Sequence, residues 1–378
     1  MIINKKFMFV AILSTACLSI CTMAGKYIFI KNVSFSMNGK IDIVNREFYD
    51  IILKAGYYDT TCIVKDLEGN DVSQSDAIKY FVENEDVEDS NGNHFVKLKK
   101  YYVNMTQDSD GVMVYKLSTK KLDDTYFVCP YFKDKDGNEI DYAYYGKYKG
   151  YVKDSKLYSI SGVTPTYSVA LDTFRAYARA NGEQYHQTDW CAAFTTQIMC
   201  MCTYKTTQSN NILTYRRYSS NTGSGTLILG IEDIVGNGLE TVDGVIFRSS
   251  ELLSDCSVSW ADKISDYTNE LTTNQTILTG ATNVVSGTSS GYISKKYYIN
   301  DKPALSLFPK EVTASSSTYY CDNFYYNDNE SGPYLVIWGA NYSFQSDGLF
   351  QIYCNNSLSN TLVAKSIYTT RLHAKILS

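Results

Sequence analysis

Short runs of β-prone residues separated by turn residues dominate the chain from residue 26 to about residue 150. The run at 33–37 alternates hydrophobic and polar positions, as a strand with one buried face does. Asn38-Gly39 and Asp110-Gly111 favour tight hairpin turns, and Asp136-Gly137 does the same between the runs at 126–128 and 142–145. The pattern predicts a β-rich N-terminal domain, residues 26–150, with a hairpin at each of these three places.

Beyond residue 155 the apolar positions change to helical spacing. Leu171 and Phe174 begin a stripe of residues three and four apart, with Ser168 as the expected N-terminal cap and Gly182 just past the end. The spacing predicts an amphipathic helix over residues 168–181.

A second helix is predicted over residues 188–204. Thr188 is its expected cap, Asp189 suits the positive end of the helix, and Trp190 and Phe194 begin one apolar face. Further positions of the helix are also apolar, so we expect it to be buried on most sides; they are Cys191, Ala192, Ala193, Met199 and Cys200. The two helices are expected to pack together at the base of a second domain, residues 151–378. Gly, Ser, Thr and Asn are dense beyond residue 208, which predicts loops and completes an α+β chain.

The first 25 residues have the pattern of an export signal. Lys5 and Lys6 precede an apolar stretch at 7–20 and a run of small residues that would suit cleavage after Ala24. Two alternatives stay open: lipidation at Cys21, and an uncleaved apolar segment that docks the protein into a larger assembly. The stretch is too short and interrupted to predict a permanent membrane span.

Composition narrows the classes of partner and cofactor. The net charge is −5 with no long basic run, so no nucleic-acid partner is expected. Three of the ten cysteines, Cys191, Cys200 and Cys202, lie in the apolar second helix, which predicts buried free thiols. Residues 134–138 superficially resemble a calcium loop, but the glycine is misplaced and a turn is favoured. No metal and no cofactor is expected.

Nine segments, in this order and spacing, resemble tail proteins of gut bacteriophages that carry the C-type-lectin-like fold shared with formylglycine-generating enzymes. The last three also resemble the variable proteins of diversity-generating retroelements. The resemblance covers roughly residues 95–378 and rests on residues 148–150, 159–165, 174–182, 185–190, 230–237, 242–245, 338–341, 348–350 and 370–372.

The resemblance implies an N-terminal β-rich domain followed by a C-type-lectin-like domain with two helices and long loops. Within it, Trp338, Leu349 and Phe350 are expected in the core, and Arg371 is expected to anchor the C-terminus by a charged hydrogen bond. The paired cysteines of the copper-dependent relatives are missing, because Cys321 and Cys354 are far apart, and so are the calcium motifs of sugar-binding lectins. Neither chemistry is carried over.

No catalytic residue is expected, since His94, His186 and His373 lie in no recognisable nucleophile motif and each is predicted to be structural or exposed. The 34 tyrosines suit strands, and those near the C-terminus also suit a binding surface. The predicted function is a receptor-binding adhesin, at a phage tail tip or on a cell surface, that recognises a host-cell-surface protein or carbohydrate. Other tail or surface subunits are expected partners, and the protein is expected to form a homotrimer.

The ligand is expected to contact C-terminal loops. In relatives diversified by retroelements, substitution at adenines yields mostly Asn, Tyr, Ser, Asp and Phe, and these residue types crowd two stretches near the C-terminus. An alternative is that the proteome simply favours Asn and Tyr in loops. A structural tail or baseplate subunit and an exported bacterial surface lipoprotein with the same fold also stay open as functions. The predicted contact residues are Tyr320, Asn323, Tyr325, Tyr326, Asn341, Tyr342, Phe344, Tyr353, Asn355 and Asn356.

Overall fold

The computed structural model describes residues 34–35, 41–42, 50–55, 60–108, 112–209, 212, 219–234, 236–249, 257–261, 263–268, 276–277, 291–298, 305–306, 308–326, 332–340, 348–357 and 367–377. Within these ranges, the side chains of residues 34, 35, 41, 42, 249, 276, 277, 326, 332, 355 and 357 are not described. The chain divides into two compact units, Met1–Glu47 and Phe48–Ser378. In the first unit, β1 (Ser34–Phe35) pairs antiparallel with β2 (Ile41–Asp42), which agrees with the predicted hairpin at Asn38-Gly39. The predicted export signal lies outside the described residues.

The second unit begins with a five-stranded sheet in the order β4-β3-β8-β7-β9. Its central hairpin joins β7 and β8 in the register Gln107↔Met113, which confirms the hairpin predicted around Asp110-Gly111. The strands are β3 (Asp50–Ala55), β4 (Ile63–Asp66), β7 (Tyr102–Gln107), β8 (Met113–Ser118) and β9 (Phe127–Val128).

A second five-stranded sheet, in the order β13-β26-β10-β6-β5, joins segments that lie far apart in the sequence. The C-terminal strand β26 is hydrogen-bonded between β10 and β13, with Ala374 opposite Tyr144 and Tyr185. The expected domain boundary at residue 150 therefore falls inside one sheet and one compact unit. The strands are β5 (Val82–Glu88), β6 (His94–Lys99), β10 (Tyr142–Gly146), β13 (Tyr185–Gln187) and β26 (Leu372–Ala374).

The prediction that the runs at 126–128 and 142–145 pair with each other as a hairpin around Asp136-Gly137 is wrong. β9 pairs with β7, and β10 pairs with β6 and β26, so the two flanking runs belong to different sheets. The turn itself forms locally, with Lys133 bridged to Glu139 and Gly137 at φ 90°. Turn chemistry depends on a few neighbouring residues, whereas strand pairing depends on where distant strands can bury their apolar faces.

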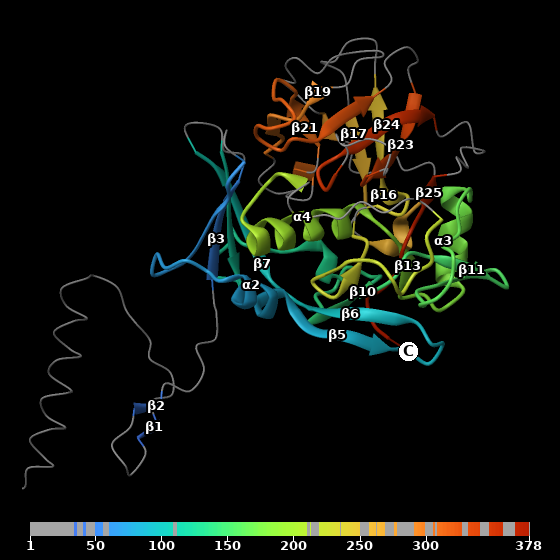
Figure 1. The fold of residues 1–378 in the computed structure, drawn as a ribbon, viewed down its shortest axis with the longest axis horizontal. Helices are drawn as coiled ribbons and strands as arrows, with labels where there is room; N and C mark the ends of the chain where they lie inside the picture. Colours follow the sequence, from blue (N-terminus) through green and yellow to red (C-terminus); the bar gives the residue numbers. More distant parts are fainter. Residues whose placement is uncertain are drawn as a thin grey trace, which may run out of the picture. The chain divides into compact units, whose positions relative to one another are not determined.

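The largest sheet lies in the C-terminal part and has eight strands, in the order β18-β17-β16-β23-β24-β22-β19 with β25 parallel to β16 (Figure 1). β22 runs parallel to β24, and the other described pairs along this order are antiparallel. The strands are β16 (Leu239–Ser249), β17 (Ser257–Trp260), β18 (Thr276–Ile277), β19 (Gly291–Tyr292), β22 (Asn323–Tyr326), β23 (Gly332–Trp338), β24 (Ile352–Ser357) and β25 (Tyr368–Thr369).

Among the described residues of this unit there are also three two-stranded sheets and two short 3₁₀ helices. The pairs are β11 (Tyr151–Lys153) with β12 (Lys156–Tyr158), β14 (Leu227–Ile228) with β15 (Ile231–Glu232), and β20 (Lys295–Lys296) with β21 (Pro309–Glu311). The 3₁₀ helices are η1 (Pro130–Phe132) and η4 (Ile264–Asp266). The chain is mixed and rich in sheet, in agreement with the predicted α+β class.

Both predicted helices form, but their caps differ from expectation. α3 (Leu171–Arg179) begins after Ala170, because Ser168 has a left-handed φ of 60° and its N–H bonds to Tyr368. α4 (Trp190–Tyr204) is capped by Asp189, whose carboxylate accepts from the Ala192 N–H at 2.7 Å. The Thr188 hydroxyl donates to Glu240 instead, so tertiary contacts decide which side chain is free to cap.

The two helices were predicted to pack together, but the main contacts of each are with other elements. α3 packs on β12, β13 and β16, whereas α4 packs on β16, β3, η1 and a helix the sequence analysis missed, α2 (Gln74–Phe81) (Figure 1). Every side chain of α4 from Trp190 to Thr203 is buried, as its mostly apolar sequence predicts. α4 is therefore part of a core that runs from Ile51 to Cys354 and includes strands from both sides of residue 150.

Three five-residue turns in this unit share the sequence Asp-x-x-Gly-Asn and one hydrogen-bond pattern. One Asp oxygen accepts the backbone N–H groups two and four residues later, and the Asn side chain donates to the other oxygen. The glycines have φ between 78° and 90°, which suits a residue without Cβ. The turns are Asp66–Asn70, Asp89–Asn93 and Asp134–Asn138.

Candidate functional site

The ten predicted contact residues do not share one environment. Tyr320, Asn323 and Asn356 are 1%, 4% and 6% exposed, so these three belong to the interior. The Asn356 amide donates to the Tyr368 hydroxyl at 2.7 Å, which gives it a structural partner. Side-chain burial could not be predicted for these residues, because Tyr and Asn occur both in pleated strands and in loops.

The side chains of five more of the ten predicted contact residues are not described. Tyr326 and Asn355 lie in β22 and β24. Asn341, Tyr342 and Phe344 lie outside the described residues. Their segment joins the end of β23 to the start of β24, two strand ends that are paired as Trp338↔Ile352.

Tyr325 and Tyr353 are brought together as a stacked pair. They lie opposite each other on the parallel strands β22 and β24, and their rings are 4.8 Å apart with an interplanar angle of 8°. Both side chains are half-buried. Tyr353 packs against an apolar cluster that includes Leu335 and Ile337, so one side of the pair is fixed by the sheet. We call Tyr325 and Tyr353 the tyrosine pair.

The tyrosine pair lies on a sheet whose strand directions bring several strand ends to one end of the sheet. Ser249 is opposite Gly332, and Ser257 pairs with both Arg248 and Ile277. The C-terminal end of β22 and the N-terminal end of β19 lie there too, since β22 is parallel to β24 and β19 is antiparallel to β22. The strand ends that flank the segments 250–256, 278–290 and 327–331 therefore all lie at this end of the sheet. The segment 358–366 runs from this end to β25, which pairs with the first residues of β16 at the opposite end. The segment 341–347 starts and finishes at the opposite end.

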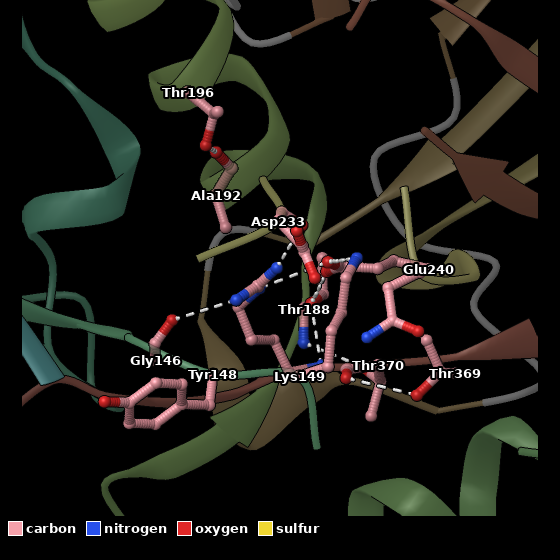
Figure 2. A network of polar contacts seen from close by, with 12 residues as sticks. Gly146, Tyr148, Lys149, Thr188, Ala192, Thr196, Asp233, Glu240, Thr369 and Thr370 are labelled. Atoms are coloured by element: carbon pink, nitrogen blue, oxygen red, sulfur yellow. Dashed lines mark hydrogen bonds and ion pairs between the residues drawn. The ribbon is translucent and has the colours of Figure 1, made fainter. Parts of the chain in front are cut away.

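A buried charged network is centred on Glu240 of β16 (Figure 2). It includes Lys149, Thr188 just after β13, and Arg371 just before β26. The Lys149 ammonium and the Arg371 guanidinium both bind the Glu240 carboxylate, and the Thr188 hydroxyl donates to its second oxygen. Arg371 also donates to the Asp233 carbonyl at 2.7 Å. Figure 2 shows Thr188, Lys149 and Glu240 pointing toward one another.

The charges in this network set one another's protonation. Burial works against both ions, yet the two cations lower the pKa of Glu240 to about 2. Burial lowers the pKa of Lys149 to about 8, against the opposing effect of Glu240. The network is therefore an ionised anchor for the C-terminal strand, which confirms the predicted role of Arg371 and its charged hydrogen bond.

A second buried cluster surrounds the N-terminus of α4. The Asp189 carboxylate lies 3.2 Å from His186 Nδ1 and accepts from the Tyr267 hydroxyl at 3.0 Å. The His186 and His373 rings stack at 5.3 Å, and His373 Nδ1 is 2.9 Å from the Tyr131 hydroxyl. Burial lowers the pKa of both histidines, so both are neutral at physiological pH. These two histidines are structural, as predicted.

The other residues assigned to the scaffold are also buried. Trp338, Leu349 and Phe350 have no exposed surface, and the Trp338 indole donates to the Leu349 carbonyl at 2.7 Å. Cys200 and Cys202 are buried free thiols, as predicted, and Cys191 is buried beside them. In the described ranges, no three His, Cys, Asp or Glu side chains gather as metal ligands, and no helix is long and apolar enough to cross a membrane.

No family model matches the chain, and no curated protein is significantly similar to it.

Proposed function

We propose that the chain is a receptor-binding adhesin that recognises a protein or carbohydrate on a host-cell surface, at a phage tail tip or on a bacterial surface. In this proposal residues 151–378 form a C-type-lectin-like domain, and the C-terminal segments carry the binding face. Other tail or surface subunits and a homotrimeric state belong to the same proposal.

The observation that carries the proposal is the tyrosine pair. Tyrosine offers a large, rigid contact area at low entropic cost, and stacked aromatic rings fix each other's orientation before a ligand arrives. The pair is half-buried on the sheet in which Trp338 and Tyr334 of β23 are buried. The division between a rigid buried scaffold and half-buried tyrosines is what a binding surface needs.

Binding is tested with the purified full chain against a panel of bacterial cell envelopes and a glycan array. The wild-type chain is expected to bind at least one envelope or glycan. Tyr325→Ala combined with Tyr353→Ala is expected to weaken that binding by well over tenfold, because truncating an aromatic anchor typically costs about 2 kcal/mol or more. Thermal melting of each variant separates lost contacts from lost folding.

Tyr142→Ala is the matched control, since Tyr142 is a tyrosine of the second unit that is 37% exposed on a different sheet. Its binding is expected to equal that of the wild type. Wild-type binding with no change in a folded double variant would place the binding face elsewhere. A folded wild-type chain that binds nothing on either panel would favour a structural tail or baseplate subunit.

A further inference from the structure

Lys296 is a buried lysine that the proposed binding function does not use. It is 2% exposed, lies in β20, and its Nζ is 2.5 Å from the Oε1 of Gln197 in the middle of α4. The Gln197 Nε2 donates to the Leu349 carbonyl at 3.1 Å, and the amide oxygen is directed toward the lysine. The amine of Lys296 and the amide of Gln197, 99 positions apart in the sequence, are thus in direct contact in the core.

The surroundings of Lys296 are apolar on two sides and acidic on one. Its Nζ lies 4.8 Å from the centre of the Tyr320 ring and 4.5 Å from that of Phe350. The Asp322 carboxylate, whose negative charge acts on Lys296, accepts hydrogen bonds from Ser209 and from the Phe350 N–H. Burial lowers the pKa of Lys296 to about 7, so a substantial fraction is a neutral, nucleophilic amine at physiological pH.

We propose that Lys296 and Gln197 form an intramolecular isopeptide bond that ties β20 to α4. The Nζ of the neutral amine attacks the Cδ of the Gln197 amide, forming the new C–N bond. The C–N bond to the original amide nitrogen breaks, and ammonia leaves. One proton moves from the attacking nitrogen to the leaving nitrogen. An amine and a primary amide give a secondary amide and ammonia, so no oxidant or other reactant is needed.

The distances place the reactants close to the geometry that this step needs. A carbonyl bond is about 1.23 Å long, so Nζ can be no more than about 3.7 Å from Cδ. Reacting atoms in a near-attack arrangement lie about 3–3.5 Å apart, and such confinement replaces a bimolecular encounter. The last torsion of a glutamine side chain has a broad preference, which allows the carbonyl face to turn toward the amine.

Lys149 shows why burial of a lysine is not enough for an isopeptide bond to form. Its Nζ also touches a side-chain carbonyl group, that of Glu240. Arg371 and Lys149 keep that carboxyl ionised, with a pKa of about 2, and a carboxylate is a poor acceptor for a nucleophile. The two lysines therefore make an internal comparison, with a link expected at Lys296 and none at Lys149.

The test is peptide mapping of the purified full chain by mass spectrometry after trypsin digestion. A linked chain should give one branched peptide that joins residues 180–205 to residues 296–310 and is lighter than their sum by one ammonia. Trypsin should fail to cut after Lys296. Lys296→Arg and Gln197→Met should each abolish the branched peptide, and Lys295→Arg should keep it, because Lys295 is partly exposed and paired with Glu311.

The wild-type digest alone can overturn the proposal, whatever the variants do to folding. Complete cleavage after Lys296 in a natively folded preparation, with the free peptides 180–205 and 297–310, would show that the pair is only hydrogen-bonded. A branched peptide at Lys149, with the loss of one water, would show that burial rather than the amide partner selects the lysine, and would also contradict the proposal.

Discussion

Tyrosine side chains divide into two groups in the described part of the chain. Tyr101, Tyr131 and Tyr145 are 1% exposed or less and fill the core, where they pack edge-on against other rings. Tyr325 and Tyr353 stay half-buried and stack on each other. The same residue type therefore supplies packing in one place and a candidate contact surface in another, and only its position in a sheet distinguishes the two uses.

Trp190 is the side chain with which stability at the residue scale is best tested. It is 1% exposed, donates its indole N–H to Ala261 at 2.8 Å and packs edge-on against Trp260. Trp190→Ala leaves a cavity in the core and is expected to lower the free energy of unfolding by about 3–5 kcal/mol. Urea denaturation measures the loss, with Leu122→Ala, at a side chain 52% exposed, as the control. Equal midpoints for the two variants would show that the cavity argument does not apply.

The two buried histidines predict a pH dependence of stability. Burial lowers the folded-state pKa of His186 and His373, whereas the unfolded chain takes up protons near pH 6.5. The unfolded state therefore binds more protons below about pH 6.5, and the free energy of unfolding is expected to fall as the pH drops from 7 toward 5.

His373→Gln tests that cause. A glutamine can still bond to Tyr131 and Thr188, the two partners of His373, but it has no charge to acquire. The fall in unfolding free energy between pH 7 and pH 5, measured by urea titration at each pH, is expected to be smaller in the variant. An identical fall in both proteins would assign the pH dependence to other groups.

At the scale of elements, the three Asp-x-x-Gly-Asn turns are the clearest local structures. The Asp89 turn joins β5 to β6, and its carboxylate also accepts from the buried Tyr185 hydroxyl at 2.9 Å. The Asp66 turn is exposed, and its carboxylate accepts hydrogen bonds from Glu68 and Asn70 within the turn. The same five-residue turn therefore makes a tertiary hydrogen bond at Asp89 in addition to the local bonds that it makes at both places.

Removing the aspartate separates the local from the tertiary contribution. Asp66→Ala is expected to lower the free energy of unfolding by about 1 kcal/mol, which is the net contribution of a typical intramolecular hydrogen bond. Asp89→Ala is expected to cost more, because it also leaves the buried Tyr185 hydroxyl without its acceptor, at about 1–3 kcal/mol. Thermal denaturation of the two variants gives the order. An equal cost would show that the Tyr185 contact adds nothing.

At the scale of the whole molecule, β26 makes residues 48–378 one unit. This C-terminal strand lies between β10 and β13, and Arg371 just before it is buried among Glu240, Asp233 and the carbonyl groups of Gly146 and Lys147. A buried charge of this kind is costly unless every partner is present. The two halves of the chain therefore depend on each other for folding.

Residues 48–150 expressed alone are expected not to fold. They would lack β26, α4 and most of the shared core, and would expose the edge of β10. Circular dichroism and amide proton dispersion in NMR spectra measure this, with residues 48–378 as the control that should fold. A cooperative melt of the short chain would show that the boundary near residue 150 separates two independent domains.

The sequence by itself determined the features that depend on neighbouring residues. It placed both α3 and α4, the pairing of β7 with β8, the turn at Asp136-Gly137, and the buried character of α4, since these follow from helical spacing and local hydrogen bonds. The resemblance added the anchoring role of Arg371. Local patterns are sufficient there because the interacting groups are only a few residues apart.

Only the tertiary structure decided which strands pair, which residues cap the helices and which tyrosines are covered. β26 reaches β10 across more than two hundred residues, Thr188 leaves its expected capping place for Glu240, and Tyr320 is buried while Tyr325 is not. The Lys296–Gln197 contact has the same origin. In each case the outcome is set by burial and hydrogen bonding between distant segments, whose free energy depends on the whole fold and has no signature within a short window of sequence.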